Sequence, residues 1–240
     1  MRNNLARARP DEWLRGDLFP FIEECWSNSV ALVALNNVVA ARLTAIDEIF
    51  HSVHGAFKPK DETQLVPVLL FLRSFSAFRA SVMVGLSLPT DAFPLQRSCL
   101  EYAGYAKLVA AQPELAKLWL QRDDNLAEVR KKFSNRAVRE AIEKDDAELG
   151  GIYQHLYELS IDFGAHPNEK GVLGSVVKGS LATGNMQVMM LPGDSLQLQH
   201  GLKTCARIGI CSLKIFNLIF RDHFAKFDFD AKIAAASKSF

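Results

Sequence analysis

Apolar residues recur every three to four positions along most of this chain, which is the spacing of one face of an α-helix. From Phe21 to His54 this period runs without Gly or Pro. It predicts a helix that would be roughly 50 Å long if unbroken. Gly and Pro residues separate the further predicted helices, which span about 62–86, 91–111, 114–121, 123–149, 152–163 and 200–224.

The segment 91–111 is apolar around almost its whole circumference, which is typical of a helix at the centre of a bundle. Pro94 falls in its first turn, where the missing N–H costs nothing. The segment also carries Arg97 and Glu101 one turn apart. Charges in such a helix are costly unless they are paired and hydrogen-bonded. We therefore expect these two side chains to pair and to recruit polar groups from the segment 153–168.

The pattern changes between 168 and 199, where five glycines interrupt the chain. Two short apolar runs, 186–191 and 195–199, flank a Pro-Gly-Asp turn, and the second run alternates apolar and polar residues. This arrangement predicts a small β-hairpin. The expected fold class is all-α, a multi-helix bundle with the hairpin inserted before the last helix.

The expected organisation has three parts. A polar and basic N-terminal arm covers 1–17, a single helical-bundle domain covers 18–227, and a loose C-terminal tail covers 228–240. The arm has no apolar run, so it is not expected to be a secretory signal.

Composition narrows the classes of protein that fit. The 240 residues include 28 basic and 27 acidic side chains, a net charge of +1, so nothing in the charge balance indicates DNA binding. The four cysteines lie in predicted helices and form no CxxC pair. This is typical of reduced core cysteines, and it predicts a cytoplasmic protein.

A long apolar segment, 65–88, is a candidate membrane span by length. It contains Arg73 and Arg79, whose insertion in a bilayer costs a few kcal/mol each. We therefore expect a buried helix of a soluble protein, with no membrane association.

Four kinds of polar group are expected near the central helix. Tyr153 and Tyr157 share one helical face, and Asp162 and His166 are also four residues apart. Together with Arg97 and Glu101, they could bind an anion or transfer a proton. The alternative is a structural network, because such networks are common inside bundles.

Two other groups are considered. Asp47, His51 and His54 lie on one helical face and form a weak alternative metal site; since histidines also favour a helix C-terminal end, no metal or other cofactor is expected. A stripe of Phe216, Phe220 and Phe224 is expected in the core, with a dimer face as the alternative.

Several short motifs resemble a broad group of uncharacterised bacterial helical proteins that are distantly similar to HEPN domains. They are Arg73 with the following AFRAS stretch, the run 95–101, and Tyr157-Glu158-Leu159-Ser160 leading to His166-Pro167. The resemblance covers about 65–225. It implies a helical bundle, often dimeric, that is either a ribonuclease of a defence or toxin system or a binding protein.

The favoured hypothesis is a HEPN-like regulatory or binding module that forms a homodimer. One alternative is a metal-independent ribonuclease in which His166 is the general acid or base and Arg97 stabilises the phosphate charge. The other is a bundle that binds a small ligand between the central helix and 153–166. RNA or a small anionic ligand would be the corresponding partner.

Overall fold

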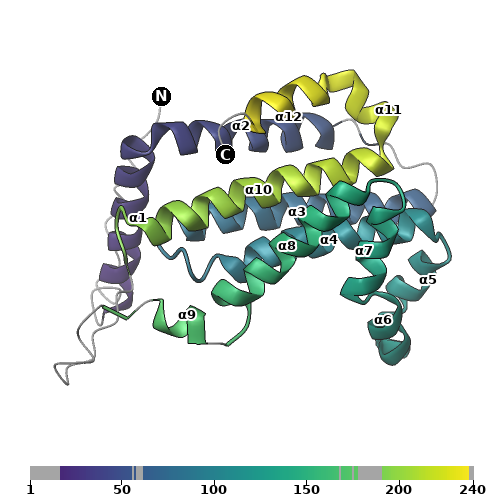
Figure 1. Cartoon of the computed structure of the whole chain (residues 1–240), viewed down its shortest axis with the longest axis horizontal. Helices are drawn as coiled ribbons and strands as arrows, with labels where there is room; N and C mark the ends of the chain where they lie inside the picture. Colours follow the sequence, from purple (N-terminus) through teal and green to yellow (C-terminus); the bar gives the residue numbers. More distant parts are fainter. Residues whose placement is uncertain are drawn as a thin grey trace.

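The computed structural model describes residues 17–55, 57, 62–167, 169–174, 176–177 and 191–237. The all-α class is confirmed, since these ranges are built of helices and contain no β-strand (Figure 1). The helices are α1 (Leu18–Leu35), α2 (Asn37–His54), α3 (Glu62–Gly85), α4 (Phe93–Ala111), α5 (Leu115–Leu120), α6 (Leu126–Lys132), α7 (Asn135–Glu143), α8 (Ala147–Ser160), α9 (Glu169–Leu173), α10 (Leu196–Ile219), α11 (Arg221–Phe224) and α12 (Phe229–Ser237). The predicted N-terminal arm, 1–17, lies outside the described residues except for Asp17.

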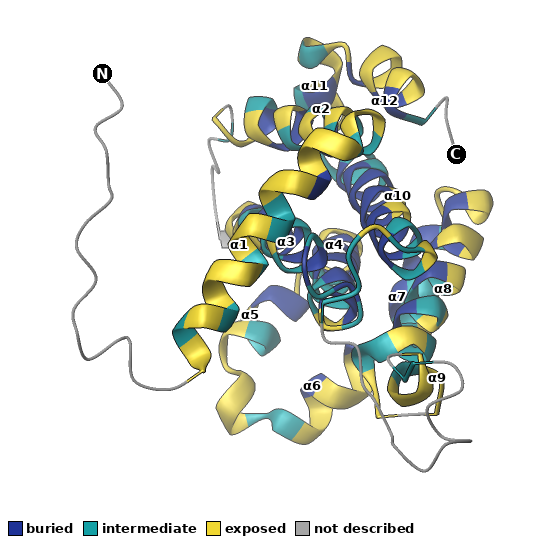
Figure 2. Ribbon diagram, turned by 90° about the vertical axis from the view of Figure 1, so that its left-hand side faces the viewer, coloured by how far each residue is buried: buried dark blue, intermediate teal, exposed yellow. Residues whose placement is uncertain are grey.

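Three long helices, α3, α4 and α10, form the core of the bundle, where the buried residues concentrate in Figure 2. The prediction that α4 is central is confirmed, because it contacts α3, α10, α7 and α8. Phe71 joins α3 to α10 and α2, its ring centroid lying 4.9 Å from that of Phe216 and 5.6 Å from that of Phe50. Burying each such side chain contributes about 1.5–3 kcal/mol.

Several polar side chains inside this core donate hydrogen bonds to backbone carbonyls, although the side-chain oxygen of Gln96 has no partner among the described residues. Ser74 on α3 donates to the carbonyl of Cys99 at 2.9 Å, and Gln96 on α4 donates to the carbonyl of Gly201 at 3.1 Å. Ser81 donates to the carbonyl of Phe78, one turn back in its own helix, at 2.8 Å. Buried hydroxyl and amide groups of this kind are costly only when left unpaired. The serines within apolar α3 are therefore accommodated by the bundle.

By length and composition, α3 could cross a membrane, and so could α1 with α2 if that bent pair were one span. In α3, 56% of the apolar window is buried against other helices, as expected for a core helix. Arg79 reaches the surface and pairs with Asp47, and Arg73 lies over the ring of Tyr102 at 5.5 Å.

The long helix predicted from Phe21 to His54 is broken, so that prediction was wrong. At Asn36 the backbone leaves the helical region (φ −109°, ψ 49°), and the axes of α1 and α2 meet at 99°. Asn is a poor helix former because its side chain competes for backbone hydrogen bonds. The apolar period continues on both sides of the bend, so the pattern alone gave no sign of it.

The single charged helix predicted over 123–149 is also divided, into a 3₁₀ turn followed by α6 and α7. Ser134 caps α7, accepting from the Ala137 N–H at 3.4 Å, and Asp146 caps α8, accepting from the Leu149 N–H at 2.9 Å. The predicted break at Gly150-Gly151 is absent, because both glycines lie within α8. Gly150 is needed there for close packing, since a Cβ would collide with the side chain of Glu143.

The prediction that 195–199 forms the second strand of a hairpin was also wrong. Ser195 caps α10, accepting from the Leu198 N–H at 3.1 Å, and 196–199 is the first turn of that helix. The capping hydrogen bond of Ser195 favours a helix here, although the alternating apolar and polar residues are typical of a strand. The first run, 186–191, lies outside the described residues apart from Leu191.

The C-terminal segment, expected to be a loose tail, contains α12. Phe229, Ile233 and Ala236 are buried, and the helix packs against α2 and α10. The predicted phenylalanine stripe lies in the core as expected: Phe216 and Phe224 are buried, and Phe220 is packed against them. It is not available as a dimer face.

Candidate functional site

The predicted ion pair on the central helix is present. Arg97 Nε lies 2.9 Å from Glu101 Oε1, one turn further along α4. The two side chains are 21% and 31% exposed, so the pair lies at the edge of the core and is partly shielded from water.

Tyr157, on α8, completes this group. Its hydroxyl accepts from Arg97 Nη2 at 2.8 Å, and the guanidinium carbon lies 4.8 Å from the ring centroid. Burial raises the pKa of Tyr157; Arg97 opposes this effect, and the charge of Glu101 adds to it. Burial alone would lower the pKa of Arg97, but Glu101 and Tyr157 offset this and raise it. We call Arg97, Glu101 and Tyr157 the polar clamp, because it joins α4 to α8.

Tyr153 belongs to the core. Its ring is fully buried against α4, where Gly104 leaves room for it, and burial raises its pKa well above the ordinary value. Tyr105, which the sequence reasoning missed, also lies close enough to Glu101 to be affected by its charge: burial raises the pKa of Tyr105, and Glu101 adds to the rise. The missed signal was spacing, because Tyr105 follows Glu101 by four residues.

Asp162 and His166 are not bonded to the clamp. Asp162 pairs with Lys170 of α9 at 2.6 Å. His166 follows the π-helical turn Ile161–Ala165, has an extended backbone and is exposed. None of the hydrogen bonds, ion pairs or ring contacts of the described residues joins His166 to Arg97, Glu101 or Tyr157. The wider cluster expected from the sequence thus reduces to three bonded side chains.

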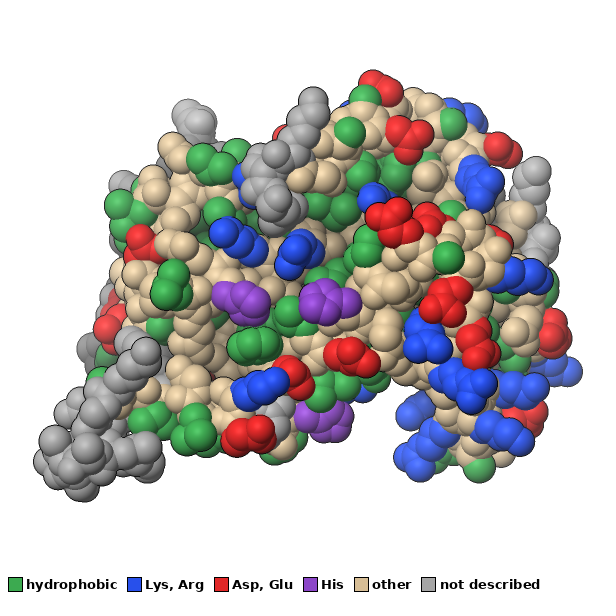
Figure 3. Space-filling view, in the orientation of Figure 1, with side chains coloured by type: hydrophobic (Ala, Val, Ile, Leu, Met, Phe, Trp, Pro, Cys, Tyr) green, Lys and Arg blue, Asp and Glu red, His purple; other side chains and the backbone are tan. Residues whose placement is uncertain are grey.

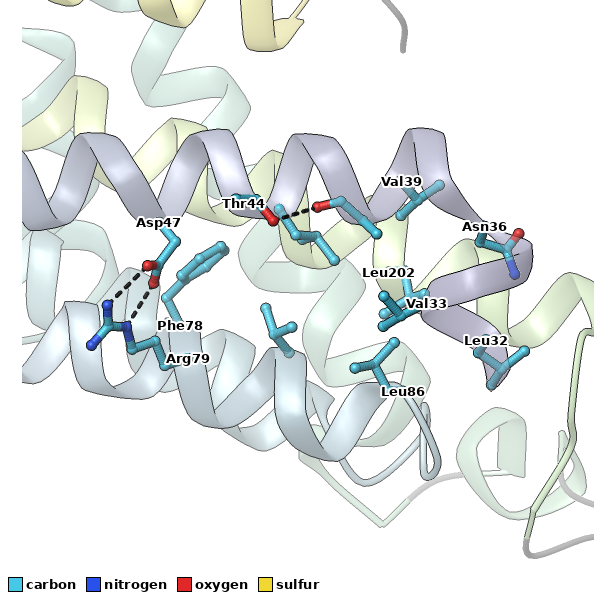
Figure 4. Close-up of a pocket in the computed structure, with 13 residues that line it drawn as sticks. Leu32, Val33, Asn36, Val39, Thr44, Asp47, Phe78, Arg79, Leu86 and Leu202 are labelled. Atoms are coloured by element: carbon cyan, nitrogen blue, oxygen red, sulfur yellow. Dashed lines mark hydrogen bonds and ion pairs between the residues drawn. The ribbon is translucent and has the colours of Figure 1, made fainter. Parts of the chain in front are cut away.

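The weak metal alternative finds no support in the geometry. Asp47 accepts two hydrogen bonds from Arg79, at 2.6 and 2.9 Å (Figure 4), so its carboxylate is already engaged. The His51 and His54 rings stack with centroids 5.9 Å apart. Within the described ranges, no three His, Cys, Asp or Glu side chains form a group that could hold a metal.

The prediction that the four cysteines are core residues is confirmed for three of them, whereas Cys25 on α1 is only partly buried. Cys99, Cys205 and Cys211 are buried. Burial raises the thiol pKa of Cys99 to about 11 and that of Cys205 to about 12. A protonated, buried thiol is a weak nucleophile, so these groups serve packing.

The surface holds one feature that the sequence reasoning missed. Helix α1 buries only Leu32 among its residues, and apolar side chains cover its outer face. Four of them share one stripe at helical spacing: Ile22, Trp26, Val30 and Val33. We call these residues the α1 stripe. Apolar side chains are visible at this end of the molecule in Figure 3.

The chain matches no protein-family model, no curated protein and no solved structure. The resemblance to HEPN domains therefore stays a prediction.

Proposed function

We propose that this protein is a HEPN-like helical binding module of the cytoplasm, and that it forms a homodimer through helix α1. One observation carries the proposal: the residues of the α1 stripe are 43–71% exposed on a helix that lies across the end of the bundle (Figure 1). Large exposed apolar patches mark interaction sites. Trp26, the most exposed of the four, is the residue type most enriched among interface hot spots.

The size of the stripe supports a second copy as the partner. Two such faces pressed together would bury on the order of 1,000 Å², the threshold of a specific interface. A twofold pairing of identical patches is the commonest way for a soluble chain to close its own assembly.

Charge favours an antiparallel pairing and disfavours a membrane. Helix α1 carries Glu23 and Glu24 near one end and no Lys or Arg. Antiparallel helices would keep these acids at opposite ends of the interface, whereas parallel helices would bring like charges together. Helices that bind membrane surfaces are typically rich in Lys and Arg.

The stripe continues into a hollow at the bend between α1 and α2. This hollow, of about 250 Å³, is lined mainly by apolar side chains, including Val33, Val39 and Leu86 (Figure 4). In an antiparallel pair, the N-terminal end of the partner's α1 approaches this bend. The hollow then offers a seat for an aliphatic side chain, as hot-spot pockets do.

Sedimentation equilibrium of wild type and Trp26→Ser tests the proposal. Losing a central tryptophan costs at least about 2 kcal/mol, so the dimer dissociation constant should rise roughly 30-fold or more. Leu196→Ser is the matched control, because Leu196 is 85% exposed on another helix and should leave dimerisation unchanged. A wild type that stays monomeric at every concentration, or a Trp26→Ser dimer as tight as wild type, would contradict the proposal.

A further inference from the structure

A second surface feature lies between α8 and α10, away from the α1 stripe. It is a groove of about 530 Å³, within the size range of small-ligand sites. Its floor is apolar and buried, formed by Leu149 and Leu156 of α8 and by Ile210 and Cys211 of α10. An apolar floor of this size favours a ligand with an apolar body.

The rim of the groove is predominantly cationic. Arg207 and Lys214 lie two turns apart on α10, and His155 faces them from α8. The only acidic residue of the lining is Glu148. Neither Arg207 nor Lys214 forms an ion pair with any residue that the structure describes. Two cations and one carboxylate leave a single positive charge, which suits a monoanion.

Gly151 gives an independent indication. A glycine in the middle of a helix costs about 1 kcal/mol relative to alanine. Its neighbour Gly150 has a packing reason, since a side chain there would collide with Glu143, but a Cβ on Gly151 would meet nothing within 4 Å. Gly151 lines the groove, and the absence of a side chain there leaves the groove wider.

We propose that the groove between α8 and α10 binds an apolar monocarboxylate, with its hydrocarbon body on the floor above Gly151 and its carboxylate beside Arg207. A guanidinium can hold a carboxylate with two hydrogen bonds. Lys214, two turns away, adds attraction without the need for direct contact. The site is separate from the polar clamp, whose guanidinium is already paired with Glu101.

Isothermal titration calorimetry with decanoate tests this assignment, with decanol as the uncharged probe. Wild type should bind decanoate more tightly than decanol, and Arg207→Gln should weaken decanoate binding by about tenfold while leaving decanol binding unchanged. Lys203→Gln is the matched control, because Lys203 lies one turn before Arg207 but outside the lining. It removes the same charge without a contact to the ligand, so it should weaken decanoate binding far less than Arg207→Gln does.

Gly151→Leu fills the groove from α8. It should abolish decanoate binding while the melting temperature stays equal or rises, because leucine is the better helix former. Equal binding of decanol and decanoate, or a Gly151→Leu variant that binds decanoate as wild type does, would overturn the proposal. Repeating the titration with Trp26→Ser separates the two surfaces, since removing the tryptophan of the α1 stripe should leave decanoate binding intact.

Discussion

Helices α4 and α1 are both rich in apolar residues, yet they lie in opposite environments. Helix α4 buries side chains all round, including Leu100, Ala103 and Val109, and its charged residues pair with partners at its edges. Helix α1 buries Leu32 alone and leaves its apolar stripe in solvent. Apolar content therefore does not decide burial; the direction of the helix axis relative to the bundle does.

The bend at Asn36 accounts for this difference. The 99° bend turns α1 away from the axis of α2, so that α1 lies across the end of the bundle near the start of α10 (Figure 1). Only the inner side of α1 is held, for example where Ser87 donates to the Cys25 carbonyl at 2.6 Å. Its outer side, with the α1 stripe, is left exposed to solvent.

The largest difference between the two helices is expected when a leucine is replaced by alanine in each of them. Leu100 of α4 is fully buried, and Leu35 of α1 is 70% exposed. Leu100→Ala should destabilise the fold by about 3–5 kcal/mol, from lost burial and the cavity left behind, whereas Leu35→Ala should cost less than about 0.5 kcal/mol. Urea denaturation of both variants measures this, and similar losses would mean that α1 is packed as tightly as α4.

Much of the framework could be predicted because local signals were sufficient for it. The all-round apolar pattern of 91–111, with Pro94 in its first turn, correctly gave the central helix. The spacing of Arg97 and Glu101 gave their ion pair, and Tyr157 was among the residues expected to join them. Arg97 and Glu101 are neighbours on one helix, so their spacing was sufficient to predict the pair. Tyr157 could be predicted because a partly buried ion pair requires further polar partners.

The failures share a different cause. A helical period does not report the direction of the axis, so the bend at Asn36 was missed. In the Ser195 turn, one capping hydrogen bond overrode an alternating pattern too short to be decisive. His166 follows Gly164, whose φ of 156° turns the chain. The direction beyond such a turn cannot be obtained from spacing along a helix.

A second prediction concerns the one lysine buried in α4. Lys107 Nζ lies 2.8 Å from Asp145 Oδ2, and the lysine side chain is 7% exposed while the carboxylate is 35% exposed. Asp145→Asn should leave the buried charge without its counter-ion and cost roughly 1–2 kcal/mol, less than for a fully buried pair because Asp145 is partly solvated. Lys107→Met should cost less, since it removes the charge as well.

The same pair predicts a pH dependence. The hydrogen bond from Lys107 holds the pKa of Asp145 below its ordinary value of 3.8. A lowered pKa in the folded state means that the stabilisation is fully present above about pH 4 and is lost as the pH falls through the lowered pKa. The difference in unfolding free energy between wild type and Asp145→Asn should therefore be constant near neutrality and shrink below about pH 4. A difference that is independent of pH would contradict this pairing.

The smallest effect on stability is expected at His166, which follows the π-helical turn after α8. The side chain is exposed and is not bonded to the polar clamp, so His166→Ala should change the unfolding free energy by less than about 0.5 kcal/mol.

The proposed binding module also requires that neither wild type nor His166→Ala cleaves RNA in the presence of a metal chelator. His54→Ala is the matched control, because His54 is likewise exposed. If wild type cleaved RNA and His166→Ala alone lost that activity at unchanged stability, the ribonuclease would replace the binding module as the better account. The loss could not then be attributed to unfolding, because the fold would have kept its melting temperature.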